Sequence, residues 1–244
     1  MSKLVTVPDG DLVRQRCHGF FDDFDHLVTA DRWTTIVSNS GAVSVSDGAG
    51  GIVTLDTSDA TAADNDESYL HTTTELFKFA NEKPLIVQAR VQFTEANTDD
   101  ANVMFGLMDG VAADALQDDG AGPKASYSGA VLFKADGSTK WSFETSLAGS
   151  QTTTETAETA GGSSYQTLRI EARSRDATTI ELIPYIDPLG GVNLQQMLDA
   201  NGNKIKHTIT LGSPTEMAVV LGVKAGGANE ENLLCDYVSA YQLR

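Results

Sequence analysis

The sequence predicts an all-β protein built as a two-sheet antiparallel β-sandwich, and three observations support this fold class. In residues 85–93, Leu85, Val87 and Val91 fall on one face of an extended chain and mostly polar residues on the other, as in a half-buried strand. Residues 103–108 are apolar on both faces, as in a central strand covered on both sides. Helical periodicity is scarce, and strand patterns recur with turn signals between them.

These two strands form the centre of the predicted core. The polar residues 94–102 between them have a turn composition, so the two strands are predicted to form a hairpin. A hairpin this apolar needs a second sheet to cover it. The residues expected to line the space between the sheets are Val87, Val91, Phe93, Phe105 and Leu107.

The chain has 244 residues and no visible internal boundary, so one large sandwich domain is the simplest organisation. A chain of this length buries roughly 70% of its unfolded surface and needs no disulfide or metal to fold. It carries 17 Lys and Arg against 34 Asp and Glu, a formal net charge of −17. Such an acidic surface repels phosphate backbones, so we expect no nucleic-acid partner.

Cys17 and Cys235 are the only cysteines, one near each end of the chain. A disulfide between them is one interpretation, but two buried thiols are favoured because two cysteines do not make a disulfide framework. Residues 1–16 contain no apolar signal-peptide core, and no apolar run approaches the roughly 20 residues of a membrane span. We therefore expect a soluble protein, made in a cytoplasm, with no membrane partner.

Residues 1–19 are predicted to form an N-terminal arm, followed by the sandwich domain at residues 20–244. Two interpretations of the arm remain open: an ordinary edge strand, or a segment that docks on another subunit. An arm with apolar side chains and cations can add a strand to a neighbour or pair with acidic groups there. The candidate partner-binding residues are Leu4, Val5, Val7, Leu12, Val13, Arg14 and Arg16.

The first part of the sandwich combines an aromatic segment with a short hairpin. The aromatic residues expected to anchor the core, among solvated or capping aspartates, are Phe20, Phe21, Phe24 and Trp33. Residues 41–56 contain two short alternating segments around the Gly-rich residues 48–51, a hairpin pattern. A polar loop follows at residues 56–68, and apolar character resumes over residues 69–79.

The middle of the chain continues this pattern. Residues 109–128 are a second acidic loop, and residues 130–143 form a hairpin with its turn at Asp136-Gly137. The Thr-, Ser- and Gly-rich residues 149–164 could be an exposed edge strand, but a long loop with a short strand in it is favoured. Residues 165–173 alternate as a strand that is wet on one side.

The last part holds one predicted helix. Pro184 restricts the strand at residues 180–186 to an edge or a bulge. Residues 194–200 have helical spacing and stop at Asn201-Gly202, which predicts a short helix. Residues 217–223 are continuously apolar and predict a buried strand. In the final strand, alternation places Cys235, Tyr237 and Leu243 on one face, so that Cys235 is a core thiol.

Several segments follow one another in a familiar order: FFDDFD and then Trp33, VQARVQF, VMFGLMD, VLFKADGSTKW, YQTLRIEARS and CDYVSAYQLR. In this order the chain resembles the concanavalin A-like (laminin G-like) jelly rolls, in particular those of tailed-phage virion proteins. The resemblance runs from about Phe20 to Arg244 and consists of core positions and turns, so it indicates fold better than function. The chain departs from it at residues 188–206, where a short turn is usual.

The resemblance implies a non-enzymatic virion structural protein, in the first place a head decoration (cement) protein on the outside of a capsid. Its partners would be the major capsid protein or other virion subunits, and as a homo-oligomer it could be a trimer on a local three-fold axis. The alternative is a carbohydrate-binding, lectin-like receptor-binding module of a phage tail or fibre. Trp33 and Trp141 are the aromatic candidates for such a module, although both lie in core-like patterns.

No catalytic motif is visible in the sequence. Glucanases of this fold take their carboxylates from one strand in a Glu-x-Asp-x-Glu or similar pattern, and no such pattern occurs. Glu155 and Glu158 would point to opposite faces of a strand. The histidines are scattered, without a nucleophile elbow, a Cys–His signature or a zinc motif. We therefore predict no enzymatic activity and no cofactor.

Calcium is the one ligand that the composition leaves open. Asp and Asn oxygens at the rim of a sandwich are its usual ligands, and lectins and laminin G-like modules of this fold often hold Ca²⁺ in that way. The weak candidates are Asp56, Asp59, Asp64 and Asp66, in a loop without the EF-hand pattern. A solvated acidic loop is the simpler interpretation, and a structural calcium is the alternative.

Overall fold

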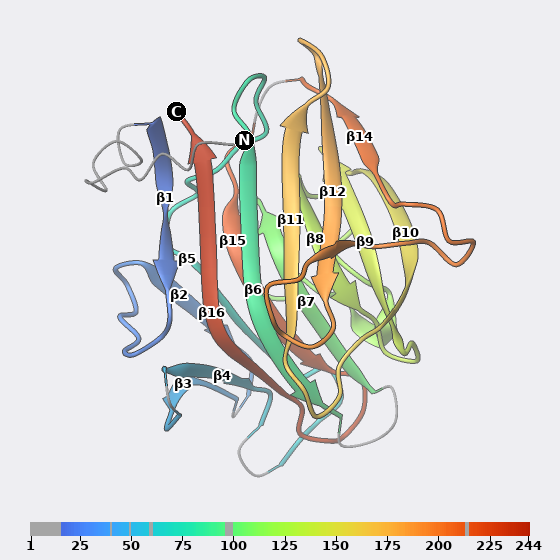
Figure 1. The fold of residues 1–244 in the computed structure, drawn as a ribbon. Helices are drawn as coiled ribbons and strands as arrows, with labels where there is room; N and C mark the ends of the chain where they lie inside the picture. Colours follow the sequence, from blue (N-terminus) through green and yellow to red (C-terminus); the bar gives the residue numbers. More distant parts are fainter. Residues whose placement is uncertain (1–15, 40, 49, 59–60, 96–99, 213–214) are drawn as a thin grey trace.

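The strand patterns build two antiparallel sheets that pack face to face, as the computed structural model in Figure 1 shows. It describes residues 16–39, 41–48, 50–58, 61–95, 100–212 and 215–244. Within this part of the chain, the nine strands of sheet A are β1 (Cys17–Asp22), β3 (Ala42–Ser46), β4 (Ile52–Asp56), β6 (Leu85–Thr94), β11 (Gln166–Ser174), β12 (Thr179–Asp187), β13 (Gln195–Gln196), β14 (His207–Thr210) and β16 (Asn232–Leu243). The seven strands of sheet B are β2 (Trp33–Val37), β5 (Glu67–Thr72), β7 (Ala101–Met108), β8 (Gly129–Lys134), β9 (Lys140–Leu147), β10 (Ser150–Thr159) and β15 (Ala218–Ala225). A 3₁₀ helix, η1 (Asp118–Gly120), lies in the loop after β7.

The strand order brings distant parts of the chain together. Sheet A runs β13-β12-β11-β6-β16-β4-β3, with β1 beside β16 and β14 beside β12. Sheet B runs β10-β9-β8-β7-β15-β5-β2. The last strands, β15 and β16, each lie in the middle of a sheet between strands from much earlier in the chain. The predicted all-β, two-sheet antiparallel sandwich is therefore confirmed.

The predicted core is also confirmed. The five residues expected between the sheets are each exposed by 1% or less and belong to one apolar cluster: Val87, Val91, Phe93, Phe105 and Leu107. The hairpin predicted over residues 41–56 forms as β3 and β4, and that over residues 130–143 as β8 and β9. All eight residues of β15 are buried, as the apolar run at residues 217–223 predicts.

The predicted hairpin of β6 and β7 is wrong, because the two strands lie in different sheets. β6 pairs with β11 and β16, whereas β7 pairs with β8 and β15. The outward-facing residues explain the separation. β6 turns polar residues such as Gln88 and Arg90 outward, while β7 turns Met104 and Met108 outward, and both methionines are fully buried. Neighbouring strands of one sheet contribute to the same outer face. The outer face of β6 is exposed to solvent and that of β7 is covered, which fits their positions in different sheets.

The predicted short helix is also wrong. Residues 194–200 instead include β13, which pairs with β12. Met197 is buried, and its backbone N–H donates to the carbonyl of Pro184. The carboxylate of Asp199 accepts backbone hydrogen bonds from Asn201 and Asn203, which closes a turn. The backbone partners offered by the edge of β12 outweigh the helical propensity of this segment.

Pro184 lies on a partly covered edge of β12, in agreement with its predicted edge position. β14 pairs with residues 179–182 and β13 with residues 185–186, which leaves a gap at the proline. The carbonyl of Pro184 points into this gap, where it accepts the N–H of Met197. The N–H that proline lacks would point the same way, so no ladder bond with β11 is lost.

The Thr-rich residues 150–159 form a ten-residue edge strand, β10, so the favoured interpretation as a long loop is wrong and the alternative is confirmed. Thr153 donates to the carboxylate of Glu144 on β9, and the hydroxyl of Thr154 lies 3.0 Å from Nε2 of His207. Threonine is β-branched and suits a half-buried strand. A register shift between Glu155 and Thr159 ends the regular pairing, as is common at sheet edges.

A bulge changes the pattern of β16. Cys235 is buried, as predicted, but Tyr237 and Leu243 face outward rather than sharing its face. The register with β6 shifts between Cys235 and Tyr237. One extra residue at a bulge reverses the alternation beyond it, so the predicted common face of these three residues is wrong.

Near the N-terminus, β1 begins at Cys17, inside the range assigned to the arm. Leu4, Val5, Val7, Leu12, Val13 and Arg14 lie outside the described residues, so the docking arm stays a prediction. Arg16 is exposed, and its carbonyl accepts the N–H of Arg244. Both cysteines are free thiols, and of the two only Cys235 is fully buried. No helix in the described ranges is long and apolar enough to span a membrane.

Candidate functional site

The outer face of sheet B is covered by the chain itself. Its central strands turn outward a set of side chains with no exposed area: Tyr69, Met104, Met108, Val131 and Val220. Residues 109–128, the second acidic loop, place Ala115, Leu116 and Tyr127 on them to complete a second apolar cluster. A ligand would have to displace this cluster to reach the sheet.

A buried lysine fixes this loop to the sheet. The ammonium of Lys224 on β15 lies 2.8 Å from Asp114, 2.5 Å from Asp118 and 3.4 Å from Glu67. It also donates to the carbonyl of Leu116 at 3.1 Å. Burial alone lowers the pKa of Lys224, but the hydrogen bonds to Asp114 and Asp118, with Glu67 nearby, raise it above its ordinary value. The lysine therefore stays charged and ties two loop carboxylates to β15.

Glu67 and Glu144, two buried glutamates on this face, do not form a glycosidase pair with each other. Glu67 on β5 and Glu144 on β9 are separated by β15, β7 and β8, which puts their backbones about 19 Å apart at the usual strand spacing. The two carboxyl groups of a glycosidase lie roughly 5 to 9.5 Å apart. Burial raises the pKa of Glu144, yet its carboxylate already accepts hydrogen bonds from Tyr127, Gln151 and Thr153. Glu144 thus anchors the loop and β10.

The outer face of sheet A, in contrast, is open, and aromatic rings gather on it. Phe21 of β1 is 52% exposed and Tyr241 of β16 is 41% exposed. The ring of Phe21 stacks on that of Tyr237, with 5.5 Å between the centroids and 26° between the planes. Phe21, Tyr237 and Tyr241 together form an aromatic strip along β1 and β16.

Polar side chains beside the aromatic strip are held by hydrogen bonds. Gln88 of β6 donates to the hydroxyl of Tyr237 at 2.6 Å and accepts from Nε of Arg169 at 2.8 Å. Arg169 also pairs with Glu171 at 3.2 Å. Aromatic rings can pack against the C–H groups of a sugar, while amide, guanidinium and carboxylate groups hydrogen-bond its hydroxyls. The face thus combines both kinds of contact that a carbohydrate needs.

A loop lies over the far part of this face. In Figure 1 the loop that follows β12 crosses in front of β11. Nε of Arg90 on β6 donates to the carbonyl of Gly190 in this loop at 2.7 Å, and the guanidinium lies 4.1 Å from the ring centroid of Tyr165. Leu189 and Val192 at the tip are 83% and 87% exposed. The open face is therefore bounded by β1 on one side and by this loop on the other.

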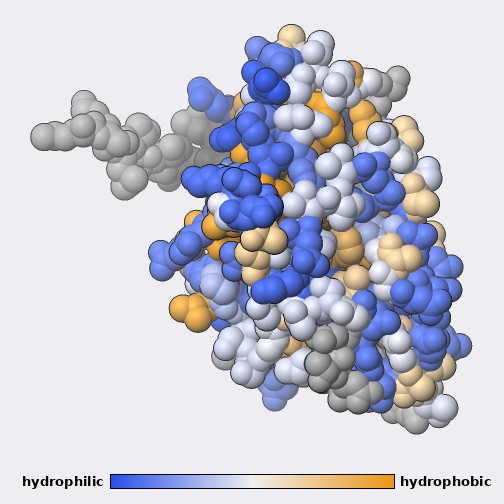
Figure 2. Space-filling view, turned by 90° about the vertical axis from the view of Figure 1, so that its right-hand side faces the viewer, coloured by the Kyte–Doolittle hydropathy of each residue, from blue (hydrophilic) through white to orange (hydrophobic). Residues whose placement is uncertain are grey.

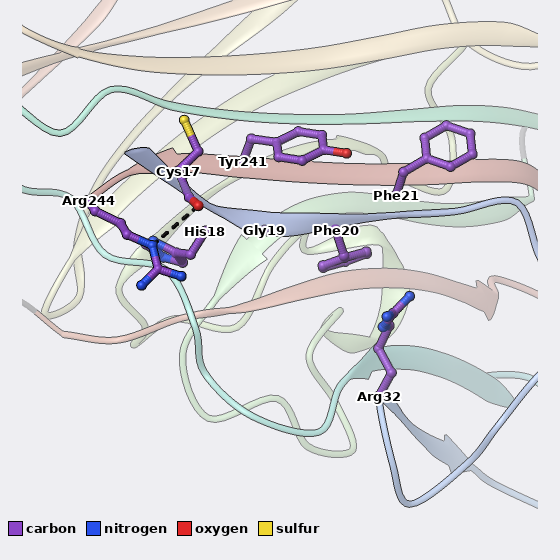
Figure 3. Close-up of a pocket in the computed structure, with 8 residues that line it drawn as sticks. All are labelled: Cys17, His18, Gly19, Phe20, Phe21, Arg32, Tyr241 and Arg244. Carbon is purple, nitrogen blue, oxygen red and sulfur yellow. Dashed lines mark hydrogen bonds between the residues drawn. The ribbon is translucent and has the colours of Figure 1, made fainter. Parts of the chain in front are cut away.

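A groove of about 620 Å³ follows the outer edge of β1 (Figure 3). Phe21 and Tyr241 lie on one side of the strand, and Phe20, Arg32 and Arg244 on the other. Arg32 lies over the ring of Phe20, 5.3 Å from its centroid. Among the described residues, the lining of the groove includes these two arginines and no acidic side chain, unlike the chain as a whole.

The opposite edge of the molecule has a different surface. Figure 2 shows the side on which β10 and β14 lie, where hydrophilic and intermediate residues prevail and hydrophobic ones are scattered. Four of the large apolar residues that are exposed, Phe21, Ile86, Tyr241 and Leu243, instead share the outer face of sheet A. The outer face of sheet A at β1 and β16 is therefore the candidate functional site.

The two tryptophans are not part of this site. Trp33 and Trp141 are 1% and 0% exposed. Nε1 of Trp33 donates to Asp22 at 2.8 Å, and Nε1 of Trp141 donates to Gln166 at 2.9 Å. Both rings belong to the core between the sheets, as their sequence patterns indicated, so neither can stack on a sugar.

The three calcium candidates that the structure describes do not gather into a metal site. Asp66 is buried, and its carboxylate accepts hydrogen bonds from the backbone N–H of Ala63 and from the side chain of Asn39, whereas Asp64 is exposed. Asp56 accepts the backbone N–H of Ser58. Asp59 lies outside the described residues. In the part of the chain that is described, no three His, Cys, Asp or Glu side chains gather as metal ligands, so calcium gains no support from the structure.

The aromatic strip was missed by the sequence analysis, which placed Phe21 in the core. Adjacent residues of an extended chain point to opposite faces, so Phe20 and Phe21 could not both be buried. Phe20 is 8% exposed and Phe21 is 52% exposed. That alternation was the available signal. Tyr241 carried no such signal, because its orientation depends on the bulge after Cys235.

Comparisons with known proteins agree with the fold. No protein-family profile and no curated protein matches the chain. Among solved structures, the endo-1,3-beta-glucanase from Streptomyces sioyaensis gives a TM-score of 0.58 at 17% identity, over 93% of this chain and 96% of the glucanase. The endo-beta-1,4-glucuronan lyase from the fungus Trichoderma reesei gives 0.57 at 11% identity, over 91% and 94%. The exoplasmic/lumenal domain of VIP36, in a Ca²⁺/Man3GlcNAc-bound form, gives 0.54 at 13% identity, over 87% and 83%.

The chain thus has the concanavalin A-like jelly-roll fold that the resemblance implied. At these identities the similarity shows the fold alone. That fold is shared here by a glucanase, a glucuronan lyase and a domain solved with Ca²⁺ and Man3GlcNAc bound, so the fold alone assigns no role to this chain. None of these three similarities ties the chain to phage decoration proteins, and that part of the resemblance stays a prediction.

Proposed function

We propose that this protein is a carbohydrate-binding module that holds a glycan on the outer face of sheet A without cleaving it. The observation that carries the proposal is the aromatic strip, in which Phe21 and Tyr241 are 52% and 41% exposed beside polar groups already held by hydrogen bonds. A contiguous patch of apolar side chains on an exposed face is a common mark of a binding site. The carbohydrate-related names of the structural neighbours point in the same direction.

The proposed contacts divide between the strands. A sugar ring packs on Tyr241 and Phe21, and its hydroxyls reach Gln88 and Arg169 on the neighbouring strands. Because the two polar side chains already hydrogen-bond each other, binding a sugar orders few additional rotamers. A flat, open face binds a single sugar weakly, so a polymer that contacts it over several residues is the expected ligand.

The carboxylates of this face support binding without cleavage. Glu171 pairs with Arg169, and Glu181 on β12 pairs with Lys206 at 2.8 Å and with Arg173 at 3.3 Å. The hydrogen bond from Lys206 is the main cause that lowers the pKa of Glu181. A glycosidase acid instead needs a raised pKa to remain protonated.

Affinity electrophoresis against soluble polysaccharides tests the proposal. The panel contains a β-1,3-glucan, a β-1,4-glucuronan and a mannan, and at least one should retard the native protein. Phe21→Ala and Tyr241→Ala should each weaken that retardation roughly tenfold, the loss of about 1.4 kcal/mol of binding energy. The matched control is Val37→Ala, which removes an apolar side chain 38% exposed on sheet B and should bind as the native protein does.

Two results would count against this function. Lack of retardation by every polysaccharide, or equal weakening by Phe21→Ala and Val37→Ala, would remove the aromatic strip as a glycan site. Release of oligosaccharides during incubation, detected by chromatography, would contradict the non-catalytic part and leave the binding site standing.

As a second candidate we propose a virion protein that decorates the outside of a phage capsid, with the major capsid protein as its partner. What favours it is the sequence resemblance, the net charge of −17 and the outer edge of β1, which pairs with no other strand in the described ranges and directly follows the predicted arm. An acidic subunit suits a solvent-facing position better than contact with packaged DNA.

Mass spectrometry of purified virions tests this second candidate, which requires the protein at high copy number. Deletion of residues 1–16 leaves every described strand, because β1 begins at Cys17. The truncated protein should therefore fold but fail to decorate particles. Absence from virions would contradict the assignment, and full decoration by the truncated protein would contradict the role of the arm.

A further inference from the structure

Exposed cations gather at one end of sheet A. At this end, which lies at the top of Figure 1, β1 and β6 begin and β11 and β16 end. Arg244 follows β16 and lies beside Arg16, because its backbone N–H donates to the carbonyl of Arg16 at 2.7 Å. The backbone N–H of Glu82, just before β6, donates to the hydroxyl of Ser174 in β11 at 2.6 Å. The cationic end of the sheet thus comprises Arg16, Lys83, Arg175 and Arg244.

These four cations are exposed, and none of them forms an ion pair with an acidic side chain in the described ranges. The guanidinium of Arg244 donates one long hydrogen bond, from Nε to the carbonyl of Cys17 at 3.3 Å. Two acidic residues share this end, Glu82 and Asp176, and the carboxylate of Asp176 accepts the backbone N–H and the hydroxyl of Thr178. Four cations against two carboxylates leave this end with a positive charge, in contrast to the chain as a whole.

The opposite end of the sandwich, where β6 ends and β7 begins, is acidic. β6 has ten residues, so the two ends lie about 30 Å apart at the rise of an extended strand. Asp136, in the turn after β8, lies beside the start of β7, since its N–H donates to the side chain of Asn102. Burial and the nearby carboxylate of Asp100 raise the pKa of Asp136, and Asp64 adds to this shift. A negatively charged polymer is therefore repelled at this end and attracted at the other.

The aromatic strip leads to the cationic end. Tyr241, 41% exposed, precedes Arg244 by three residues, about 10 Å along an extended strand. Leu243 between them is also exposed, and so is Ile86, which pairs with Tyr241. Arg244 lies on the other side of the strand from Tyr241 (Figure 3). The cations thus line the rim over which a polymer passes when it leaves the strip.

We propose that the glycan held on the aromatic strip is an anionic polysaccharide, whose carboxylate or sulfate groups pair with the cationic end of sheet A. This inference rests on the glycan-binding function proposed above and names the class of its ligand. Three of the four cations are arginines, and a guanidinium can form two parallel hydrogen bonds to one carboxylate.

The net charge of −17 does not prevent this binding. At physiological salt, exposed charges more than about 8 Å apart are largely screened from each other. The acidic end, about 30 Å away along β6, therefore has little effect at the cationic end. The acidic surface elsewhere restricts a polyanion to this one end, so that the polymer leaves the strip in one direction along β16.

Surface plasmon resonance over immobilised polysaccharides tests the proposal with two matched pairs. The carboxylate pair is hydroxyethyl cellulose and a β-1,4-glucuronan, and the sulfate pair is a β-1,3-glucan and its sulfated derivative. The full chain should bind the anionic member of at least one pair roughly tenfold more tightly than the neutral member. Added salt should reduce this preference, because exposed charge pairs are screened. The pair with the larger preference identifies the anionic group.

A charge reversal tests whether the cationic end makes the contact. Lys83→Glu should weaken binding to the anionic polymer roughly fivefold, and binding to the neutral polymer far less, because it replaces an attraction by a repulsion. The matched control is Lys204→Glu, which makes the same change at another exposed lysine. Lys204 precedes β14, at the edge of sheet A that lies farthest from β1, and its reversal should leave the preference unchanged.

The outcomes separate this inference from the function on which it rests. Equal binding of both members in both pairs, or equal weakening by Lys83→Glu and Lys204→Glu, would overturn the anionic class and leave glycan binding standing. Absence of binding to all four polymers would remove the proposed function and this inference with it. Poly-glutamate and single-stranded DNA are further arms. If either binds as tightly as the anionic polysaccharide, charge alone is recognised without a sugar, and the proposal is overturned.

Discussion

The two sheets of this sandwich have opposite outer faces. Sheet B is covered by residues 109–128, which bury Met104 and Met108 beneath a second apolar cluster. Sheet A leaves Phe21 and Tyr241 in contact with solvent. Both sheets supply their inner faces to the same core, so the fold itself does not explain the difference. Of the two outer faces, that of sheet A is the one that the described chain leaves open.

The difference is already present in the strands. β6, in sheet A, alternates buried residues with exposed or partly exposed ones that are mostly polar, whereas all eight residues of β7, in sheet B, are buried. Lys224 adds a charged contact that fixes residues 109–128 over sheet B. The cover is therefore built into the sequence and is not an accidental contact of a surface loop.

Substitutions on β7 test whether the outer face of sheet B is a second core. Met104→Ala should lower the free energy of unfolding by about 2 to 5 kcal/mol, and Phe105→Ala on the inner face by about 3 to 5 kcal/mol, because each empties a filled site. Met104 and Phe105 are exposed by 0% and 1%. Denaturant titration of both variants measures the losses. A Met104→Ala variant as stable as the native protein would show that the cover does not seal this face.

Removal of the lysine tests what holds the cover. Lys224→Ala should lower the free energy of unfolding by roughly 3 kcal/mol. This is the lower end of the range for breaking a buried ion pair, since Asp114 and Asp118 are partly exposed and can be hydrated after the lysine is removed. Limited proteolysis should then cut within residues 109–128. Lys206→Ala breaks an ion pair whose lysine side chain is 46% exposed, and it should change stability by less than about 1 kcal/mol. Resistance of the Lys224→Ala loop to protease would contradict this role.

Acidification should weaken the core beside β14 through His207. Its Nδ1 lies 3.0 Å from the hydroxyl of Thr145 and its Nε2 lies 3.0 Å from that of Thr154, and burial lowers its pKa to about 4. Between about pH 6.5 and 4 the unfolded chain binds a proton that the folded chain does not. The free energy of unfolding therefore decreases as the pH is lowered through this window, by up to roughly 3 kcal/mol. This loss should be absent from His207→Gln.

Denaturant titration of the native protein and of His207→Gln at a series of pH values isolates this effect from the titration of the carboxylates. The difference between the two free energies of unfolding should shrink as the pH falls through this window. A difference that stays constant from pH 7 to pH 4 would show that His207 is protonated equally in both states.

The sequence contained much of the fold but little of the topology. Alternation found the strands and the core residues, because burial on one face leaves a period of two. It could not assign β6 and β7 to separate sheets, since consecutive strands pair in only about two-thirds of cases. The helix predicted at residues 194–200 failed for a related reason: the edge of β12 offers hydrogen bonds that local propensity does not contain.

The candidate site was harder to predict, because it joins the two ends of the chain. Phe21 and Tyr237 stack only because β1 pairs with β16. The bulge between Cys235 and Tyr237 turns Tyr237 and Tyr241 outward, and a bulge leaves no mark in the alternation before it occurs. The sequence could show one part of the site: of the adjacent residues Phe20 and Phe21, one must face outward.

Substitutions on the outer face of sheet A should have the smallest effects on stability. Gln88→Ala removes a side chain that hydrogen-bonds Tyr237 and Arg169, and it should lower the free energy of unfolding by about 1 kcal/mol or less, since both partners can reach water instead. Phe21→Ala, at a half-exposed ring, should stay within about 0.5 kcal/mol of the native protein. Denaturant titration measures both changes. A loss above about 2 kcal/mol, the range of buried sites, would mean that this face serves stability as the outer face of sheet B does. Small losses of stability together with weakened polysaccharide retardation would instead show that the two outer faces have different roles: that of sheet B stabilises the fold, and that of sheet A binds a ligand.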